Sequence, residues 1–189
     1  MYKLYMTDVP IYSVFCIDYR YDRLTADYFK AVGLSNLYFA ATAAGAALPL
    51  GYPCYCSCSC TNGSCNPCNK DMALLRANLV KNLQIALTLQ PITNIYLLNH
   101  QDCGAIKAYL SCSGYPTTLG ANNAKEIQIN ATLLTYAQRY MAKKFPTKTI
   151  RLGLIDINGT VADYNPLTKT WTKIYTGPGT DPLGLWYNL

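Results

Sequence analysis

The feature that most constrains the fold of this chain is an alternation of short apolar runs with helical patterns. The apolar runs are rich in β-branched and aromatic residues, which favours strands. They cover residues 11–18, 37–42, 94–99 and 149–157. Stretches with helical periodicity lie between them, at residues 25–32, 72–90, 105–110 and 124–144. Strands that alternate with helices predict an α/β fold, with a mainly parallel β-sheet and flanking helices.

The last part of the chain has a different pattern. Residues 160–163 and 170–175 have the composition of two further strands on either side of Asn165-Pro166, a turn-forming pair. We therefore expect a C-terminal hairpin. Nothing in the sequence repeats and no linker divides it, so residues 1–189 are expected to form a single domain.

Composition narrows the classes of partner. Of the 189 residues, 51% are hydrophobic and only 14% are charged, which is typical of a folded protein and suggests burial of surface in a homodimer or larger homo-oligomer. The net charge of +6 is scattered along the chain, so no nucleic-acid partner is expected. No segment has the apolar length of a membrane helix, and residues 1–8 lack the apolar core of a signal peptide. We therefore expect no membrane association and an intracellular, cytoplasmic location.

Residues 51–70 form a cysteine-rich segment that we expect to be an inserted loop. It contains six of the nine cysteines, namely Cys54, Cys56, Cys58, Cys60, Cys65 and Cys68. In an extended chain the first four side chains point to one face, and together with the last two they would suit a thiolate metal site. Disulfides that staple a loop without a core of its own are the alternative interpretation. The sequence favours neither.

His100 is the only histidine of the chain, and the residues around it indicate a metal site. It directly follows the apolar run at 94–99, and Cys16 stands near the end of the first run. Ligands of a parallel sheet bind at the carboxyl ends of its strands, which places both side chains at one edge. Cys103 lies one helical turn beyond His100 and faces the same way. Three such ligands leave a zinc ion with one free position, which is typical of catalytic zinc, although a single histidine is more often a packing residue.

The residues around these ligands resemble the motifs of the β-class carbonic anhydrases. Cys16-x-Asp18-x-Arg20 follows one strand, and His100-x-x-Cys103-Gly104 follows a later one. Residues 38–45 and 152–159 resemble two other strands of that family, and the order and spacing match over most of the chain.

The resemblance implies a zinc enzyme that converts CO2 and water reversibly to bicarbonate and a proton. Cys16, His100 and Cys103 would bind the zinc ion. Asp18 and Arg20 would form the family's carboxylate–guanidinium dyad, in which Arg20 keeps Asp18 ionised and Asp18 orients the nucleophile. The family also has a closed form in which this aspartate binds the metal, so Asp18 would be a fourth zinc ligand there. The family is built on dimers, in agreement with the oligomer expected from composition.

Several positions depart from the family's pattern. Tyr19 stands where a small residue is usual, Thr42-Ala43 replaces Arg-Asn, and Asn99 replaces a glycine. No second histidine exists to relay a proton, so buffer, water or another group would have to accept it. The alanine-rich residues 40–47 would give an apolar pocket, which suits CO2.

Two other functions compete with CO2 hydration. Hydrolysis of carbon disulfide or carbonyl sulfide uses the same zinc chemistry on the same fold, and the motifs do not separate these substrates. A catalytically silent structural or assembly protein would account for the high tyrosine and cysteine content and for the altered residues 42 and 43. The intact dyad of Asp18 and Arg20 favours an enzyme, because a scaffold has no need of it.

Overall fold

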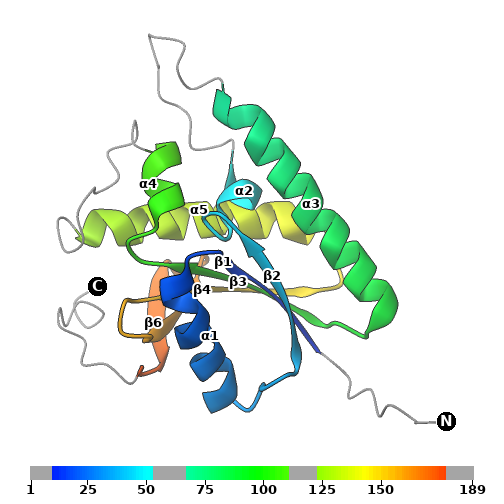
Figure 1. The fold of residues 1–189 in the computed structure, drawn as a ribbon, viewed down its shortest axis with the longest axis horizontal. Coiled ribbons are helices and arrows are strands. Elements are labelled where there is room, and N and C mark those ends of the chain that lie inside the picture. Colours follow the sequence, from blue (N-terminus) through cyan, green and yellow to red (C-terminus); the bar gives the residue numbers. More distant parts are fainter. Residues whose placement is uncertain (1–9, 53–66, 111–122, 178–189) are drawn as a thin grey trace.

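A six-stranded sheet with helices on both faces makes up the core of the computed structural model, which describes residues 10–52, 67–110 and 123–177 (Figure 1). The strands are β1 (Ile11–Cys16), β2 (Tyr38–Ala43), β3 (Asn94–His100), β4 (Thr149–Ile155), β5 (Val161–Asn165) and β6 (Thr170–Tyr175). The helices are α1 (Tyr19–Ala31), α2 (Leu48–Gly51), α3 (Pro67–Leu89), α4 (Gly104–Leu110) and α5 (Asn123–Lys144).

The strands lie in the order β2-β1-β3-β4-β5-β6, and the first four of these are parallel. The other two continue the sheet in antiparallel fashion and form the expected hairpin. The α/β fold and the mainly parallel sheet predicted from the sequence are therefore confirmed. Because β1 and β3 are parallel neighbours, their carboxyl ends meet at one edge.

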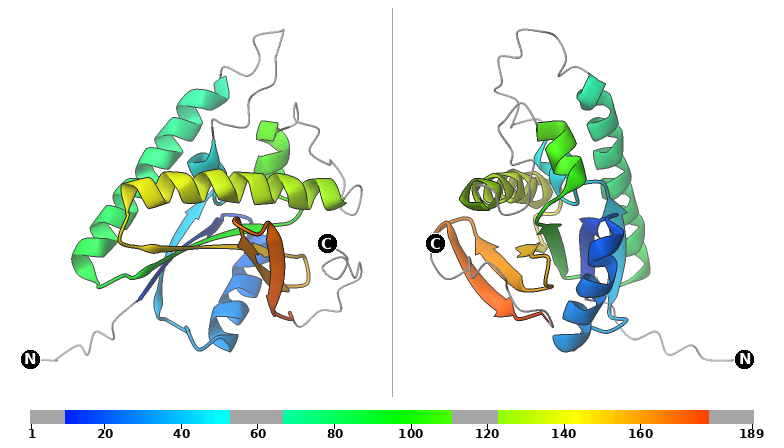
Figure 2. Two further views of the ribbon diagram at one scale, coloured as in Figure 1. Left: turned by 180° about the vertical axis from the view of Figure 1, so that it is seen from behind. Right: turned by 60° about the vertical axis from the view of Figure 1, so that its left-hand side comes forward.

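Two hydrophobic layers hold the helices to the sheet. Alternate residues of β1 point to opposite faces, as they must in a strand. Tyr12 and Val14 belong to the cluster formed with α3 and α5, whereas Ile11 and Phe15 belong to the cluster formed with α1. Figures 1 and 2 show this division, with α1 on one side of the sheet and the two long helices on the other. Strand β1, which lies between β2 and β3, is buried along its whole length, as expected for a parallel sheet covered on both faces.

The first helix begins earlier than predicted. The sequence indicated a strand to residue 18 and a helix at 25–32, but β1 ends at Cys16 and α1 spans Tyr19–Ala31. Asp18 is the N-cap, and its carboxylate accepts a hydrogen bond from the backbone N–H of Arg20. The buried stripe of α1 is Tyr21, Thr25, Tyr28 and Phe29. Three of these four carry a hydroxyl group and so give a weaker apolar signal than leucine or valine.

The boundaries of the cysteine-rich segment also differ from the prediction. Gly51 ends the short helix α2, which was not predicted, and α3 begins at Pro67 instead of residue 72. Proline fits the first turn of a helix, where its missing N–H is not needed, so it starts α3 instead of blocking it. Cys68 therefore belongs to a helix. Residues 53–66, with the other five cysteines, lie outside the described residues, so metal binding and disulfide formation both stay predictions.

The strand predicted at 149–157 ends at Ile155 because the next residue closes a turn. The Asp156 carboxylate accepts hydrogen bonds of 2.8 Å from the backbone N–H groups of Asn158 and Thr160. Gly159, at φ +83°, completes this turn and leads into β5.

Within the described ranges, none of the helices combines the length and the hydropathy needed to cross a membrane.

Candidate metal centre

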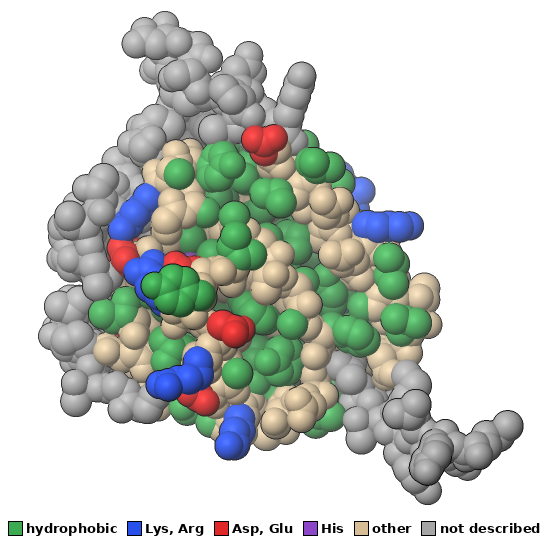
Figure 3. All heavy atoms as spheres, in the orientation of Figure 1, with side chains coloured by type: hydrophobic (Ala, Val, Ile, Leu, Met, Phe, Trp, Pro, Cys, Tyr) green, Lys and Arg blue, Asp and Glu red, His purple; other side chains and the backbone are tan. Residues whose placement is uncertain are grey.

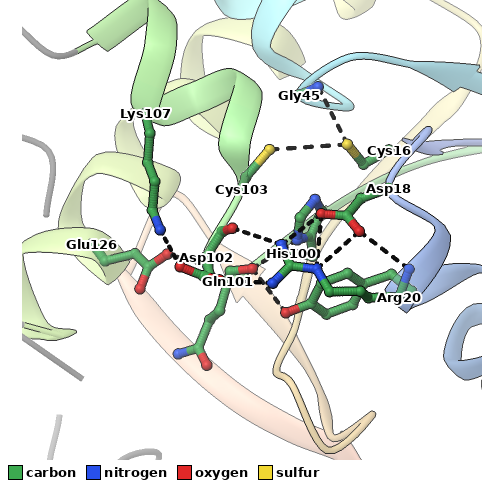
Figure 4. A network of polar contacts seen from close by, with 11 residues as sticks. Cys16, Asp18, Arg20, Gly45, His100, Gln101, Asp102, Cys103, Lys107 and Glu126 are labelled. Atoms are coloured by element: carbon green, nitrogen blue, oxygen red, sulfur yellow. Dashed lines mark hydrogen bonds and ion pairs between the residues drawn. The ribbon is translucent and has the colours of Figure 1, made fainter. Parts of the chain in front are cut away.

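Three metal-binding side chains converge where β1 and β3 end (Figure 4). Cys16 is the last residue of β1, His100 is the last residue of β3, and Cys103 directly precedes α4. Their ligand atoms all lie within 4.8 Å of one another, and all three residues are buried. The two sulfur atoms are 3.9 Å apart. The fold thus brings together the three side chains that the sequence predicted as metal ligands.

One nitrogen of His100 is held by the protein and the other is left available. Nδ1 lies 2.7 Å from the backbone carbonyl oxygen of Gln101, to which it can donate a proton, and the Tyr21 hydroxyl donates to the same oxygen. The Tyr21 ring also packs on the imidazole, with 4.0 Å between centroids. Nε2 is buried and has no hydrogen-bond partner in the described part of the chain. A carbonyl on one ring nitrogen is how metal-binding histidines are usually oriented, so the orphaned Nε2 fits a metal ligand.

The Cys16 sulfur is favoured as a thiolate, the form that binds a cation. The hydrogen bond from Cys103 lowers the pKa of Cys16 to about 4, against the opposing effect of burial. The same contact, together with burial, raises the pKa of Cys103. The backbone N–H of Gly45 also lies 3.4 Å from the Cys16 sulfur and donates to it. Thiolate and imidazole are the ligands that zinc prefers, and the donor set therefore fits this ion.

Asp18 and Arg20 make the contact that the sequence predicted. The guanidinium donates from Nε to Oδ1 at 3.0 Å and from Nη2 to Oδ2 at 2.6 Å. These hydrogen bonds are the main reason why the pKa of Asp18 is lowered. The Asp18 carboxylate is not among the ligand atoms that cluster within 4.8 Å. It is held by Arg20, and a role as fourth ligand stays a prediction.

Sequence analysis did not identify a second carboxylate that contacts Arg20. Asp102 Oδ2 accepts a hydrogen bond from Arg20 Nη1 at 2.8 Å, and the Asp102 carbonyl oxygen accepts one from Nη2 at 3.0 Å. Lys107 pairs with the other carboxylate oxygen of Asp102, and Glu126 accepts a hydrogen bond from the Asp102 backbone N–H at 2.6 Å. Partial burial opposes ionisation of Asp102, but the hydrogen bonds from Lys107 and Arg20 outweigh it and lower its pKa. An acidic residue between His100 and Cys103 was the only signal in the sequence.

Asn99 directly precedes His100, at a position where the β-class carbonic anhydrase motif has glycine. It stabilises the backbone around the candidate metal centre. Its side chain is fully buried, accepts a hydrogen bond from the Ala47 backbone N–H at 3.0 Å, and donates to Asn130 at 2.9 Å. These bonds tie β3 to α5 and to the turn that contains Gly45. Gly45 and Ala46 both have positive φ, +78° and +52°, so this turn needs such support.

A pocket of about 400 Å³ adjoins the candidate centre at Cys16. Its walls are Cys16, Ile17, Asp18, Tyr19, Arg20, Ala44, Gly104 and Ala105. Of the alanines at 40–47 that were expected to give an apolar pocket, only Ala44 lines this one. Ala40 and Ala41 line a separate pocket, and Ala43, Ala46 and Ala47 are buried in the core. Tyr19 is 86% exposed and stands at the rim. A larger cavity, of about 590 Å³, lies between α5 and the β5–β6 hairpin and does not include these residues.

No protein-family model and no curated protein matches the sequence. Among solved structures, the chain is similar to the β-carbonic anhydrase isoform I of the protozoan Trichomonas vaginalis, with a TM-score of 0.47 and 16% identity over 94% of this chain and 88% of that chain. It is also similar to the β-carbonic anhydrase CcaA, with a TM-score of 0.46 and 15% identity over 87% of this chain and 84% of that chain.

Proposed function

We propose that this protein is a zinc enzyme that catalyses the reversible hydration of CO2 to bicarbonate and a proton. The observation that carries the proposal is the buried cluster of Cys16, His100 and Cys103, whose imidazole Nε2 has no partner among the described residues. The cluster adjoins a pocket that also contains the ion pair of Asp18 and Arg20. A ligand set of three leaves a zinc ion one position for a reactant, as catalytic sites require.

When bound, zinc supplies a nucleophile at neutral pH, because it lowers the pKa of water from about 15.7 to about 7. Arg20 keeps Asp18 ionised by hydrogen bonds to both carboxylate oxygens. Asp18 then accepts a hydrogen bond from the attacking water. This bond orients the water so that a lone pair of the water oxygen points toward CO2. Ile17, Ala44 and Ala105 give the pocket an apolar wall, which suits an uncharged linear substrate.

The proton released by the reaction does not leave through a histidine. His100 is the only imidazole, it is buried, and its Nδ1 is engaged with a backbone carbonyl. Water and buffer molecules that enter the pocket therefore accept the proton. The pocket reaches the surface beside Tyr19, so buffer has access to it.

Zinc analysis and stopped-flow CO2 hydration test the proposal. Zinc-loaded protein should accelerate hydration in proportion to buffer concentration, and Cys16→Ala should lose both the metal of this site and the activity. Zinc-loaded wild type that holds the metal on Cys16, His100 and Cys103 but hydrates no CO2 at any pH would contradict the proposal. Carbonyl sulfide and carbon disulfide should be offered to the same samples, because hydrolysis of either one alone would favour the alternative enzyme. Absence of activity on all three substrates would favour a structural role.

We also propose that the protein acts as a homodimer or a larger homo-oligomer in a reducing, cytoplasmic compartment. Large apolar side chains are exposed at the pocket rim, where Ile17 is 64% exposed, and on α3, where Leu74 is 62% exposed. Figure 3 shows hydrophobic side chains spread over the visible face with few charged groups between them. The free thiols of Cys16 and Cys103 suit a reducing compartment. Light scattering of the purified protein measures the oligomeric state.

A further inference from the structure

Arg20 is held by two carboxylates that come from different parts of the fold. Asp18 lies in the turn between β1 and α1, and Asp102 lies between β3 and α4. All three nitrogen atoms of the guanidinium donate to one or the other (Figure 4). Arg20 therefore joins the turn that follows Cys16 to the turn that lies between His100 and Cys103.

Asp102 is itself fixed more firmly than an ordinary surface carboxylate. Its side chain is 15% exposed and also pairs with Lys107 on α4. Its backbone N–H donates to Glu126 on α5. Its φ of +56° is uncommon for a residue other than glycine, and such a conformation persists only where several contacts determine it. These contacts fix the backbone and the carboxylate of Asp102 in the position from which the carboxylate contacts Arg20.

We propose that Asp102 is a positioning residue, which holds the Arg20 guanidinium on Asp18 and so keeps the Asp18 carboxylate away from the metal position. The inference rests on the proposed function in one respect only, that Cys16, His100 and Cys103 bind a metal ion. Without the Asp102 carboxylate, residue 102 holds Arg20 only by its backbone carbonyl oxygen. The weaker hold leaves Asp18 free to turn toward the cation, where it would block the position that a reactant needs.

Binding of azide to the Co(II)-substituted protein tests this inference without any measurement of catalysis. Azide is a small anion that binds an open metal position and changes the visible spectrum of Co(II). Asp102→Asn is the first variant, because asparagine tolerates a positive φ and keeps the side-chain shape. Asp102→Gly is the second, because glycine accepts the same backbone conformation without any side chain.

We expect each Asp102 variant to bind azide about tenfold more weakly than wild type, the size expected for one charge-assisted hydrogen bond. The direction of the change in azide affinity distinguishes this inference from a simple charge effect. Loss of a negative charge by itself favours an anion, so a weaker affinity reports that Asp18 has taken the metal position. The double variant Asp18→Asn with Asp102→Asn should regain wild-type affinity or better, because the amide no longer competes as a carboxylate does.

Two controls complete the experiment. Asp27→Asn removes an exposed carboxylate of α1 whose contact with Arg23 is 3.8 Å long, and it should leave azide affinity within about twofold of wild type. Cys16→Ala gives the spectrum of any cobalt held elsewhere, for instance by the cysteines between residues 54 and 68, and is subtracted.

Unchanged or tighter azide binding in both Asp102 variants would overturn the inference. Failure of the double variant to regain affinity would also overturn it, since Asp102 would then not act through Asp18. Wild type that takes up no cobalt at this site would overturn it together with the metal centre. If the azide affinities follow the expected order but the zinc protein hydrates no CO2, only the proposed function fails.

Discussion

Two of the three candidate ligands, His100 and Cys16, are prepared for a cation by neighbouring groups. A carbonyl oxygen fixes the ring of His100, and a thiol hydrogen bond stabilises the thiolate of Cys16. Both contacts are made by groups of the protein itself, and such contacts hold a ligand side chain in the orientation that binding needs. The protein itself therefore sets which donor atoms are charged.

This preparation predicts an acidic thiol in the metal-free protein. The pKa of Cys16 is about 4 when folded, whereas an unfolded cysteine has a pKa of about 8.5. A lowered pKa gives stability that is complete above the unfolded pKa and is lost as pH falls through the folded one. The free energy of unfolding of wild type minus that of Cys16→Ala should therefore increase from pH 4 towards neutral pH. The thiolate absorbance difference between the same two proteins should have its midpoint near pH 4, and a midpoint at the ordinary cysteine value would contradict the prediction.

The charge of Asp18 matters to the proposed reaction more than its shape does. Asp18→Asn should retain zinc but reduce CO2 hydration about 100-fold or more, the range of a lost acid–base or orienting group. Because the pKa of Asp18 lies below its usual value, the wild-type carboxylate is ionised throughout the neutral range, and the loss should be the same from mildly acidic to mildly basic pH. Asp27→Asn is the matched control and should keep its activity. Wild-type rates in Asp18→Asn would show that the dyad has no catalytic role.

At the scale of the elements, α2 and α5 approach so closely that only glycine fits between them. A Cβ atom added to Gly51 would lie 2.5 Å from the backbone carbonyl oxygen of Leu133. Backbone atoms cannot turn away as a side chain can, so Gly51→Ala should lower the free energy of unfolding by about 1–3 kcal/mol or more. Gly104→Ala is the control, since a Cβ there meets nothing within 4 Å, and it should change stability by less than about 0.5 kcal/mol. Urea denaturation compares the two, and equal midpoints would contradict the close packing.

The elements show which signals in the sequence are sufficient. Strands β1 and β3 were predictable because their apolar runs are short and rich in β-branched and aromatic residues, which favours a buried strand over a buried helix. The start of α1 was not, because a capping carboxylate and a buried stripe rich in hydroxyl-bearing residues determine it. The start of α3 was missed for a related reason, since proline at a helix start looks like a helix breaker in a sequence.

At the scale of the whole molecule, the parallel sheet accounts for most of the candidate site. Cys16 and His100 were predicted to meet because parallel strands end at one edge, and the described fold places them there. The support around them was not predictable, since Asp102 and Glu126 meet only through the packing of α4 and α5. Asn99 likewise depends on Asn130, which lies 31 positions further along the chain.

The metal centre does not depend on the cysteine-rich segment for any ligand that the structure describes, which gives a last prediction. Residues 54–65 should be replaced by a short Gly/Ser linker, which ends before α3 begins at Pro67. Cys68, which lies within α3, should be replaced by serine. This protein should bind a single zinc ion per chain with wild-type CO2 hydration, since Cys16, His100 and Cys103 are anchored by β1, β3 and α4. Adding Cys103→Ala to the shortened chain should remove that zinc. A shortened chain that folds, as judged by its circular dichroism, but carries no zinc would show that the cysteine-rich segment holds the metal and that the three ligands are wrongly assigned.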